Sequence, residues 1–286
     1  MSKVKTILIK EDIISPKGVI IIPKGKLLKL DLITIDRLKS HGVYYEVLES
    51  KNNSSQHEQT KNSFSNEISI KEYMLSDNDN NISLNMLNHN NSKKYRIISN
   101  LMNEFVFDGR NEEWYLYLKT LLNGYSWHYS HSINVAGIST MIGLSLGYTK
   151  EQLDHLILGS LLHDVGVILL PKNILLKDRN LFTSEEKAIF EKHSSLGYEM
   201  VKNLSISETC KRIVLDHHKL LNGNGYPNSE EDDELSIESK IVMVSDYFDS
   251  ETTNKKPPKD IITYLVDNPD KFPIEIVSIL KNVFNL

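Results

Sequence analysis

Leu161-Leu-His-Asp-Val-Gly-Val167 is the stretch on which the interpretation of the whole chain depends, because its apolar run stops at two adjacent side chains that can both bind metal, His163 and Asp164. A His-Asp pair by itself is weak evidence for a metal site, since helix caps, surface ion pairs and core hydrogen bonds use the same residues. Its meaning therefore depends on which other residues the fold brings to it.

The residues before this pair predict a buried helix. Thr149, followed three positions later by Gln152, forms a capping-box signature, and the helix is expected to end at Gly166. Its inward face is formed by Leu153, Leu156, Ile157 and Leu161. His163 and Asp164 then lie in its last turn, where adjacent side chains diverge by about 100°. The pair suits a site in which each side chain reaches a different metal, or in which one bridges two.

Four more predicted helical segments carry histidine or aspartate on or next to an apolar stripe. They cover residues 114–146, the segment after 183, 207–218 and 237–249, and their inward candidates are His131, His193, His217, His218 and Asp246. With His163 and Asp164 these make seven nitrogen and oxygen ligands, more than one zinc ion takes. The set suits two cations such as Mn or Fe. The alternative is a set of unrelated core histidines, each with its own hydrogen bond.

Composition limits the classes of protein that need to be considered. The chain has 286 residues, 40% of them hydrophobic, which is enough to bury a core. Its single cysteine, Cys210, excludes an internal disulfide and a cysteine-based zinc site. The net charge of -5 gives no general attraction to nucleic acid or anionic lipid. No signal peptide or membrane span is recognisable, so a cytoplasmic protein with no nucleic-acid or membrane partner is expected.

The first third of the chain differs from the rest. Residues 1–48 predict a small accessory α+β module, with strands at 6–9, 18–22 and 43–48 and a short helix near 30–40. Residues 49–92 are rich in Asn, Ser, Lys and Asp, a composition that is typical of a linker. Helical periodicity follows over 93–286. The fold class expected is mainly α, an all-helical domain preceded by the small α+β module.

The order of these residues resembles the HD-GYP family, the branch of HD-domain phosphohydrolases that hydrolyses cyclic di-GMP. The matching motifs are His131, His163-Asp164-x-Gly166, Pro171, His193, His217-His218, Gly223-x-Gly225-Tyr226-Pro227 and Asp246-x-x-Asp249. The resemblance covers about residues 114–286 and implies an all-helical domain with a centre of two or three metals. It also implies that the seven inward residues are the ligands. A third metal would call for a carboxylate one turn before His131, where Trp127 stands, so two metals are favoured.

The chain departs from the family pattern where substrate would be held. Val167 replaces the lysine that usually follows His-Asp-x-Gly and contacts the substrate phosphate. Lys219 replaces the usual Glu after the histidine pair, and Asn222 replaces the usual Asp before Gly-x-Gly. The family's Ala-Leu-Thr-Ser-x-Arg-Pro-Tyr continuation appears as Ser250-Glu-Thr-Thr-Asn-Lys-Lys-Pro257, in which Lys255 keeps a cation at the arginine position but lacks the arginine fork. Lys177 does match the family pattern.

The leading hypothesis is hydrolysis of cyclic di-GMP to pGpG, GMP or both. Two metals, Fe or Mn, would lower the pKa of a bridging water, and the hydroxide would attack phosphorus in line with the leaving 3'-oxygen. Asp164 would bridge the metals, so Asp164 and Lys177 are the candidate catalytic residues. Charge on the phosphate would be offset by Lys177, Lys219 or Lys255.

The glycine-rich loop and the altered motifs leave further alternatives open. Tyr226 and the amides of its loop, including that of Gly225, are candidates for shaping the substrate pocket or for recruiting a signalling protein. The alternatives for the whole domain are a non-catalytic module that keeps its metals and senses a nucleotide or binds a protein, and a hydrolase of another nucleotide. Val167 and the altered tail after Asp249 motivate the first of these.

Overall fold

A computed structural model describes five short strands within residues 5–48 and then residues 82–228 and 234–286. The chain divides into two compact units. One contains residues 1–65 and 169–183, and the other contains residues 66–168 and 184–286. Each unit is described by itself.

The first unit contains two small antiparallel sheets. Strand β1 (Lys5–Ile9) pairs with β4 (Leu27–Leu30) on one side and with β5 (Tyr45–Leu48) on the other, while β2 (Ile13–Ile14) pairs with β3 (Ile20–Ile22). Helix α7 (Lys172–Leu175) and the 3-10 turn η4 (Arg179–Leu181) also belong to it. The predicted strands fall on β1, β3 and β5. Apart from Leu30, the predicted helix near 30–40 lies outside the described residues, so the α+β module stays a prediction.

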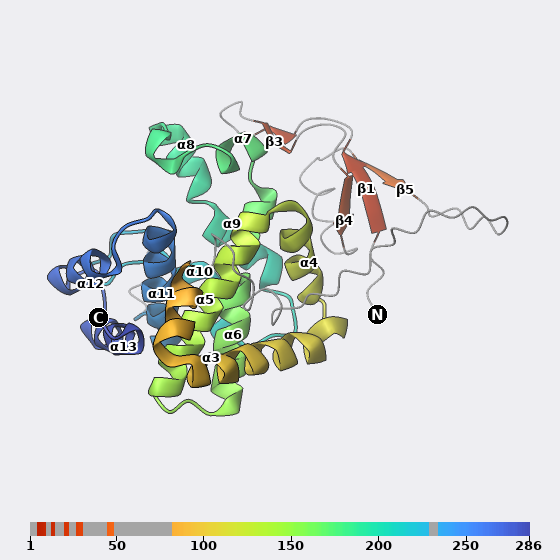
Figure 1. Cartoon of the computed structure of the whole chain (residues 1–286). Coiled ribbons are helices and arrows are strands. Elements are labelled where there is room, and N and C mark those ends of the chain that lie inside the picture. Colours follow the sequence, from red (N-terminus) through yellow and green to blue (C-terminus); the bar gives the residue numbers. More distant parts are fainter. Residues whose placement is uncertain are drawn as a thin grey trace. The chain divides into compact units, whose positions relative to one another are not determined.

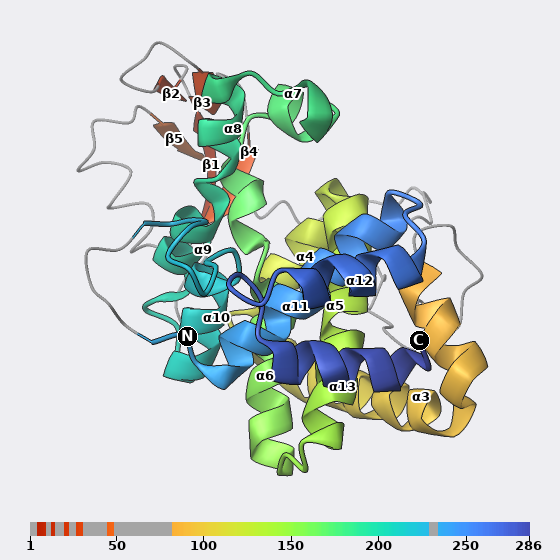
Figure 2. The same ribbon diagram turned by 90° about the vertical axis from the view of Figure 1, so that its left-hand side faces the viewer.

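The second unit is helical and holds most of the described chain, as predicted. Its α-helices are α3 (Ile82–Asp108), α4 (Tyr115–Gly124), α5 (Ser126–Ser145), α6 (Lys150–Leu162), α8 (Ser184–Phe190), α9 (His193–Val201), α10 (Glu208–Asp216), α11 (Ile237–Thr253), α12 (Pro258–Asp267) and α13 (Ile274–Phe284). Helix α5 runs through the middle, with α3, α6 and α11 packed around it (Figures 1 and 2). Every residue from 128 to 143 is buried, as expected for a helix enclosed on all sides.

The helix before the His-Asp pair begins as predicted but ends earlier. Thr149 and Gln152 form the complete capping box. Helix α6 ends at Leu162 instead of Gly166, His163 is its C-cap, and the 3-10 turn η3 (Val165–Leu169) follows. A Cβ at Gly166 would lie 1.9 Å from the carbonyl oxygen of His193 and 2.5 Å from the amide nitrogen of Gly197. The tight turn therefore depends on glycine, because it brings the His-Asp pair against the backbone of α9.

Two expected boundaries were wrong. The helical segment over 114–146 is divided between α4 and α5 at Tyr125, whose backbone is not helical (φ -144°, ψ 54°). The linker predicted over 49–92 ends earlier, because residues 82–92 form the first turns of α3. Although this stretch is polar in composition, Leu84 and Leu87 are completely buried. They lie three positions apart, on one face of the helix, and this face packs into the core.

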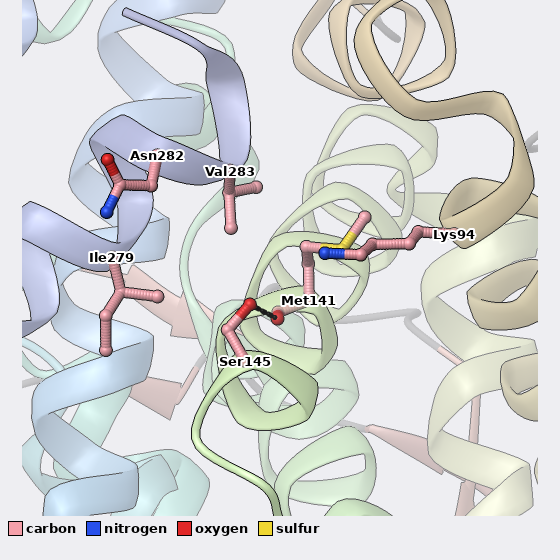
Figure 3. A pocket seen from close by; sticks show the side chains of 6 residues that line it. All are labelled: Lys94, Met141, Ser145, Ile279, Asn282 and Val283. Atoms are coloured by element: carbon pink, nitrogen blue, oxygen red, sulfur yellow. Dashed lines mark hydrogen bonds between the residues drawn. The ribbon is translucent and has the colours of Figure 1, made fainter.

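Two other features of the helical unit lie apart from its histidines. A cleft of about 230 Å³ is lined by Lys94, Met141, Ser145, Ile279, Asn282 and Val283 (Figure 3). None of these residues was predicted to bind metal or substrate. Among the described residues, Lys150–Leu169 is long and apolar enough to cross a membrane, but 72% of its most apolar window is buried inside the fold. This segment contributes to the protein core.

Candidate metal centre

The structure brings all seven predicted ligands together. They come from five helices or their ends: His131 from α5, His163 and Asp164 from the end of α6, His193 from the start of α9, His217 and His218 from the end of α10, and Asp246 from α11. Their ligand atoms form two groups, each within 4.8 Å: Asp164, His193, His217 and His218 in one, and His131, His163 and Asp164 in the other. Asp164 belongs to both groups, which is the position of a bridging ligand.

Asp246 connects the two groups from the opposite helix. Its Oδ1 lies 2.9 Å from Nε2 of His131, and its Oδ2 lies 3.5 Å from Nδ1 of His218. Burial alone would raise the pKa of Asp246, but the hydrogen bond to His131 and the neighbouring histidines hold that pKa well below its usual value. The carboxylate is therefore ionised at neutral pH.

Three of the histidines are fixed in the same tautomer by backbone carbonyls. Nδ1 of His163 lies 2.7 Å from the carbonyl oxygen of Ser160, and Nδ1 of His193 lies 2.8 Å from that of Phe190. Nδ1 of His217 lies 3.0 Å from the carbonyl oxygen of Val214. Because a carbonyl oxygen can only accept, each Nδ1 carries the hydrogen, and in the neutral ring each Nε2 presents a bare lone pair.

Those lone pairs converge in a buried space. Nε2 of His193 lies 3.2 Å from Nε2 of His217 and 3.2 Å from Oδ1 of Asp164. Nε2 of His163 is buried and has no hydrogen-bond partner among the described residues. Acceptors that face one another out of reach of water repel, and a buried polar group without a partner is costly. A divalent cation would satisfy all of them, so the residues present fit a metal site.

The charge states agree with this interpretation. Burial, reinforced by His218 and His163, holds the pKa of His217 well below 6.5. Burial likewise lowers the pKa of His218 to about 3, so both imidazoles are neutral at pH 7. Burial alone would raise the pKa of Asp164, but the surrounding histidines hold it well below its usual value. Neutral imidazoles and an ionised carboxylate are the forms that bind metal.

His131 differs from the other ligands because both of its ring nitrogens face carboxylates. Nε2 lies 2.9 Å from Asp246, and Nδ1 lies 2.7 Å from Oδ2 of Asp249. Burial alone would lower the pKa of His131, but these two carboxylates raise it to about 10. The ring of Trp127 stacks on the imidazole at 5.2 Å, with an interplanar angle of 10°. Trp127 thus supplies an aromatic face where a third metal would require a carboxylate.

Sequence reasoning assigned no role to two residues that support this centre. Asp249 is 1% exposed and binds His131 through one oxygen and the hydroxyl of Ser83 through the other. The sequence offered a signal for Asp249, because it follows Asp246 by three positions and so shares its helix face. It offered none for Ser83, which lies inside the predicted linker.

The glycine-rich loop lies directly against the ligands, as predicted. The Tyr226 ring centroid is 4.6 Å from that of His218 and 5.8 Å from that of His193. The amide of Tyr226 donates to the carbonyl oxygen of His218 at 3.2 Å. Gly225 has a φ of +95°, and a Cβ there would lie 2.2 Å from the same carbonyl oxygen. Only glycine therefore fits at position 225, where the loop passes close to the backbone of His218.

The predicted cationic residues have different environments. Nζ of Lys219 lies 2.9 Å from Oδ1 of Asp216, and its side chain is 14% exposed. Lys255 is exposed just after α11. Lys177 lies in the first unit, two residues after α7, so its role at the centre stays a prediction. Val167 is completely buried and presents no charge to a substrate.

Comparison with known proteins identifies the family of this chain. The family model of the HD domain matches residues 116–265, more than half of the chain. The chain therefore belongs to the HD domain family, and its predicted place among the HD-GYP proteins is confirmed. The solved structure of Bd1817, an HDG"Y"P protein from Bdellovibrio bacteriovorus, aligns with 100% of this chain and 96% of its own at a TM-score of 0.51. Because the two are only 15% identical, this likeness concerns the fold.

Curated relatives share the same region. The cyclic di-GMP phosphodiesterase of Thermotoga maritima is 31% identical over 46% of this chain and 36% of the relative. The cyclic di-GMP phosphodiesterase PdeB of Borreliella burgdorferi is 26% identical over 56% of this chain and 44% of the relative. The 3'3'-cGAMP-specific phosphodiesterase 2 of Vibrio cholerae is 33% identical over 36% of this chain and 20% of the relative. The chain thus matches less than half the length of each of them.

Proposed function

We infer that this chain is a metal-dependent phosphodiesterase that hydrolyses a cyclic dinucleotide, with cyclic di-GMP as the first candidate and pGpG, GMP or both as products. The observation that carries the proposal is the buried convergence of Nε2 lone pairs from His163, His193 and His217 on the carboxylate of Asp164. The names of the curated relatives support the choice of substrate class.

In the proposed centre the seven residues would hold two divalent ions, Fe or Mn. Bound metals would supply Lewis acidity toward a phosphodiester oxygen and lower the pKa of a water to near neutrality. Asp164 would contact both ions, because among the described residues it alone belongs to both groups of ligand atoms. The carbonyl-bound Nδ1 atoms keep three imidazoles oriented with Nε2 inward, which fixes the ligand geometry before substrate arrives.

The substrate would lie beside the glycine-rich loop. Tyr226 stands next to His218 and His193, so its ring is placed to form one wall of the site. In this proposal Lys177 and Lys255 offset phosphate charge. Lys219 could do so only by loosening its ion pair with Asp216. The same loop, with Gly225 at its tight return, is the surface proposed for a signalling-protein partner.

A second candidate function is a module that binds its nucleotide without turning it over. It is favoured by Val167, which stands at the position of the usual phosphate-binding lysine and is completely buried. A site that holds metals but lacks this cation would still bind a cyclic dinucleotide through them. The two functions differ in turnover and not in metal content.

The test uses the full chain, stripped of metal and then loaded with Mn or Fe. Metal content is counted, and turnover of cyclic di-GMP and of 3'3'-cGAMP is followed by chromatography. We expect two metal ions per chain, and we expect Asp164→Asn to abolish turnover and lower the metal content. Asp154→Asn is the matched control, because Asp154 lies on α6 and pairs only with Lys150 on the surface among the described residues.

The outcomes separate the candidates. A fully loaded protein that binds either dinucleotide but leaves both intact would favour the binding module. A protein that binds no metal, or turnover unchanged by Asp164→Asn, would refute the proposed centre.

A further inference from the structure

The first turn of α3 is connected to the candidate metal centre by a chain of hydrogen bonds. Ser83 is the second residue of α3 and is completely buried. Its hydroxyl donates to Oδ1 of Asp249, a residue 166 positions away in the chain. The other oxygen of the same carboxylate binds Nδ1 of His131 at 2.7 Å. The chain Ser83, Asp249, His131 thus links a helix that supplies no ligand to a residue that does.

The chemistry of Asp249 explains why this buried carboxylate needs both of its hydrogen-bond donors. Both oxygens of a carboxylate accept hydrogen bonds, and Asp249, at 1% exposure, has no access to bulk water. Among the described residues, Ser83 and His131 are its hydrogen-bond partners, one for each oxygen. If a buried carboxylate loses one of its two hydrogen-bond donors, one of its oxygens is left without a partner, which costs free energy. The carboxylate is then expected to rotate toward the remaining donor. In this site the remaining donor is a metal ligand.

The orientation of His131 depends on this carboxylate. With Nδ1 donating to Asp249, the imidazole presents Nε2 toward Asp246 and the ligand cluster. Carboxylates that hold a ligating histidine in this way fix its tautomer and raise its basicity, and their removal typically weakens metal binding by about 10-fold to 100-fold. Ser83 stands one hydrogen bond further out, so its effect should be smaller than that of Asp249.

We propose that Ser83 is a positioning residue of the metal centre, which holds Asp249 so that Asp249 holds His131, and that the first turn of α3 is thereby part of the site. The inference rests on the metal centre of the proposed function. It also assigns a role to a segment whose polar composition is typical of a linker, because displacement of this turn would loosen a metal ligand.

The test compares two buried serines of the same helix. Ser83→Ala removes the donor to Asp249. Ser99→Ala is the matched control, because Ser99 is 3% exposed on α3 and its hydroxyl has no hydrogen-bond partner among the described residues. Manganese affinity is measured by titration calorimetry on metal-stripped full-length protein. We expect Ser83→Ala to weaken binding roughly 5-fold and Ser99→Ala to change it by less than about 2-fold.

Two further measurements distinguish positioning from a general loss of stability. In the metal-free protein the imidazole proton on Nδ1 of His131 should shift in the proton NMR spectrum of Ser83→Ala but not of Ser99→Ala. In an Asp249→Ala background, Ser83→Ala should have no additional effect on manganese affinity, because the residue through which it acts is gone. Should Ser83→Ala fold poorly, Ser83→Cys keeps the size with a weaker donor and should give an intermediate affinity.

The inference and the proposed function fail in different ways. If wild type binds manganese and Asp164→Asn does not, but Ser83→Ala binds as wild type does, only the positioning role is overturned. An equal loss in Ser99→Ala, or an additive effect of Ser83→Ala in the Asp249→Ala background, overturns it as well. If wild type binds no metal, the proposed function itself fails.

Discussion

At the scale of single residues, Val167 stands where the family pattern has the lysine that is expected to contact the substrate phosphate. A lysine at this position would contact substrate only if the side chain reached the site, but Val167 is completely buried and its amide donates to the carbonyl oxygen of Asp164 at 3.0 Å. The tight turn at Gly166 fixes this backbone against α9. Compared with the family pattern, valine at this position therefore changes the packing of the turn and also removes a positive charge.

Val167→Lys is therefore expected to destabilise the protein and not to raise turnover. Burying an ammonium group without a partner costs several kcal/mol, and we expect a loss of about 3 kcal/mol in urea unfolding. Val167→Ala, which removes packing but adds no charge, should cost about 2 kcal/mol. A Val167→Lys protein as stable as wild type and with higher turnover would show that the side chain reaches the substrate.

At the scale of elements, the approach of the His-Asp turn to α9 determines whether His193 joins the cluster. Gly166→Ala would place a Cβ 1.9 Å from the carbonyl oxygen of His193, and backbone cannot move aside as a side chain can. We expect it to cost about 3 kcal/mol in urea unfolding and to weaken manganese binding. Gly124→Ala, with nothing within 4 Å of its Cβ at the end of α4, should change stability by less than about 1 kcal/mol. Equal behaviour of the two variants would contradict the proposed close approach.

The packing of α10 on α6 can be followed through the single cysteine. Cys210 is completely buried on α10, and its thiol donates to the carbonyl oxygen of His155 on α6 at 3.2 Å. Burial raises the pKa of the thiol to about 11, so the folded protein should react slowly with iodoacetamide. The ends of these two helices carry four of the seven proposed ligands, and bound metal should hold them together.

Metal should therefore protect Cys210 from alkylation. At a metal concentration 100 times the dissociation constant, an opening that breaks the centre is disfavoured by about 2.7 kcal/mol, which corresponds to a rate roughly 100-fold lower. The measurement is the mass increase of the intact protein over time, with and without manganese. Asp164→Asn should show no protection by metal, and wild type in urea should react equally fast in both conditions. Unchanged rates in folded wild type would mean that the metal does not join α6 to α10.

At the scale of the whole molecule, the sequence was sufficient to predict those features of the fold and of the candidate site that depend on local periodicity. Apolar spacing of about 3.6 residues identified which histidines and aspartates face inward. Six of the seven fall into the two groups of ligand atoms, and Asp246 contacts His131 and His218. Spacing could not reveal that Ser83 binds Asp249, because that contact joins residues 166 positions apart. It also missed the helix ends at Tyr125 and His163. Near His163 the chain turns at Gly166, which packs closely against the backbone of α9.

The same long-range arrangement would make the proposed metal centre a link between five helices, and its affinity for metal should depend on pH. In the metal-free protein burial alone would lower the pKa of His131, but the carboxylates of Asp246 and Asp249 raise it from 6.5 to about 10, so the imidazole keeps a second proton. This proton stabilises the fold fully below pH 6.5, and its contribution is lost as the pH rises through 10. A metal that binds Nε2 must displace it, whereas His217 and His218 are already neutral at pH 7.

Metal binding should accordingly release one proton between pH 6.5 and 8.5. The affinity for manganese should then rise about 10-fold per pH unit, and saturating metal should add about 1.4 kcal/mol more stability for each unit. Urea unfolding with and without manganese at pH 6.5, 7.5 and 8.5 measures this difference directly. A constant difference would show that His131 gives up no proton, and hence that the metals bind without it. A rising difference would show that metal binding displaces a proton, as expected if His131 is a ligand.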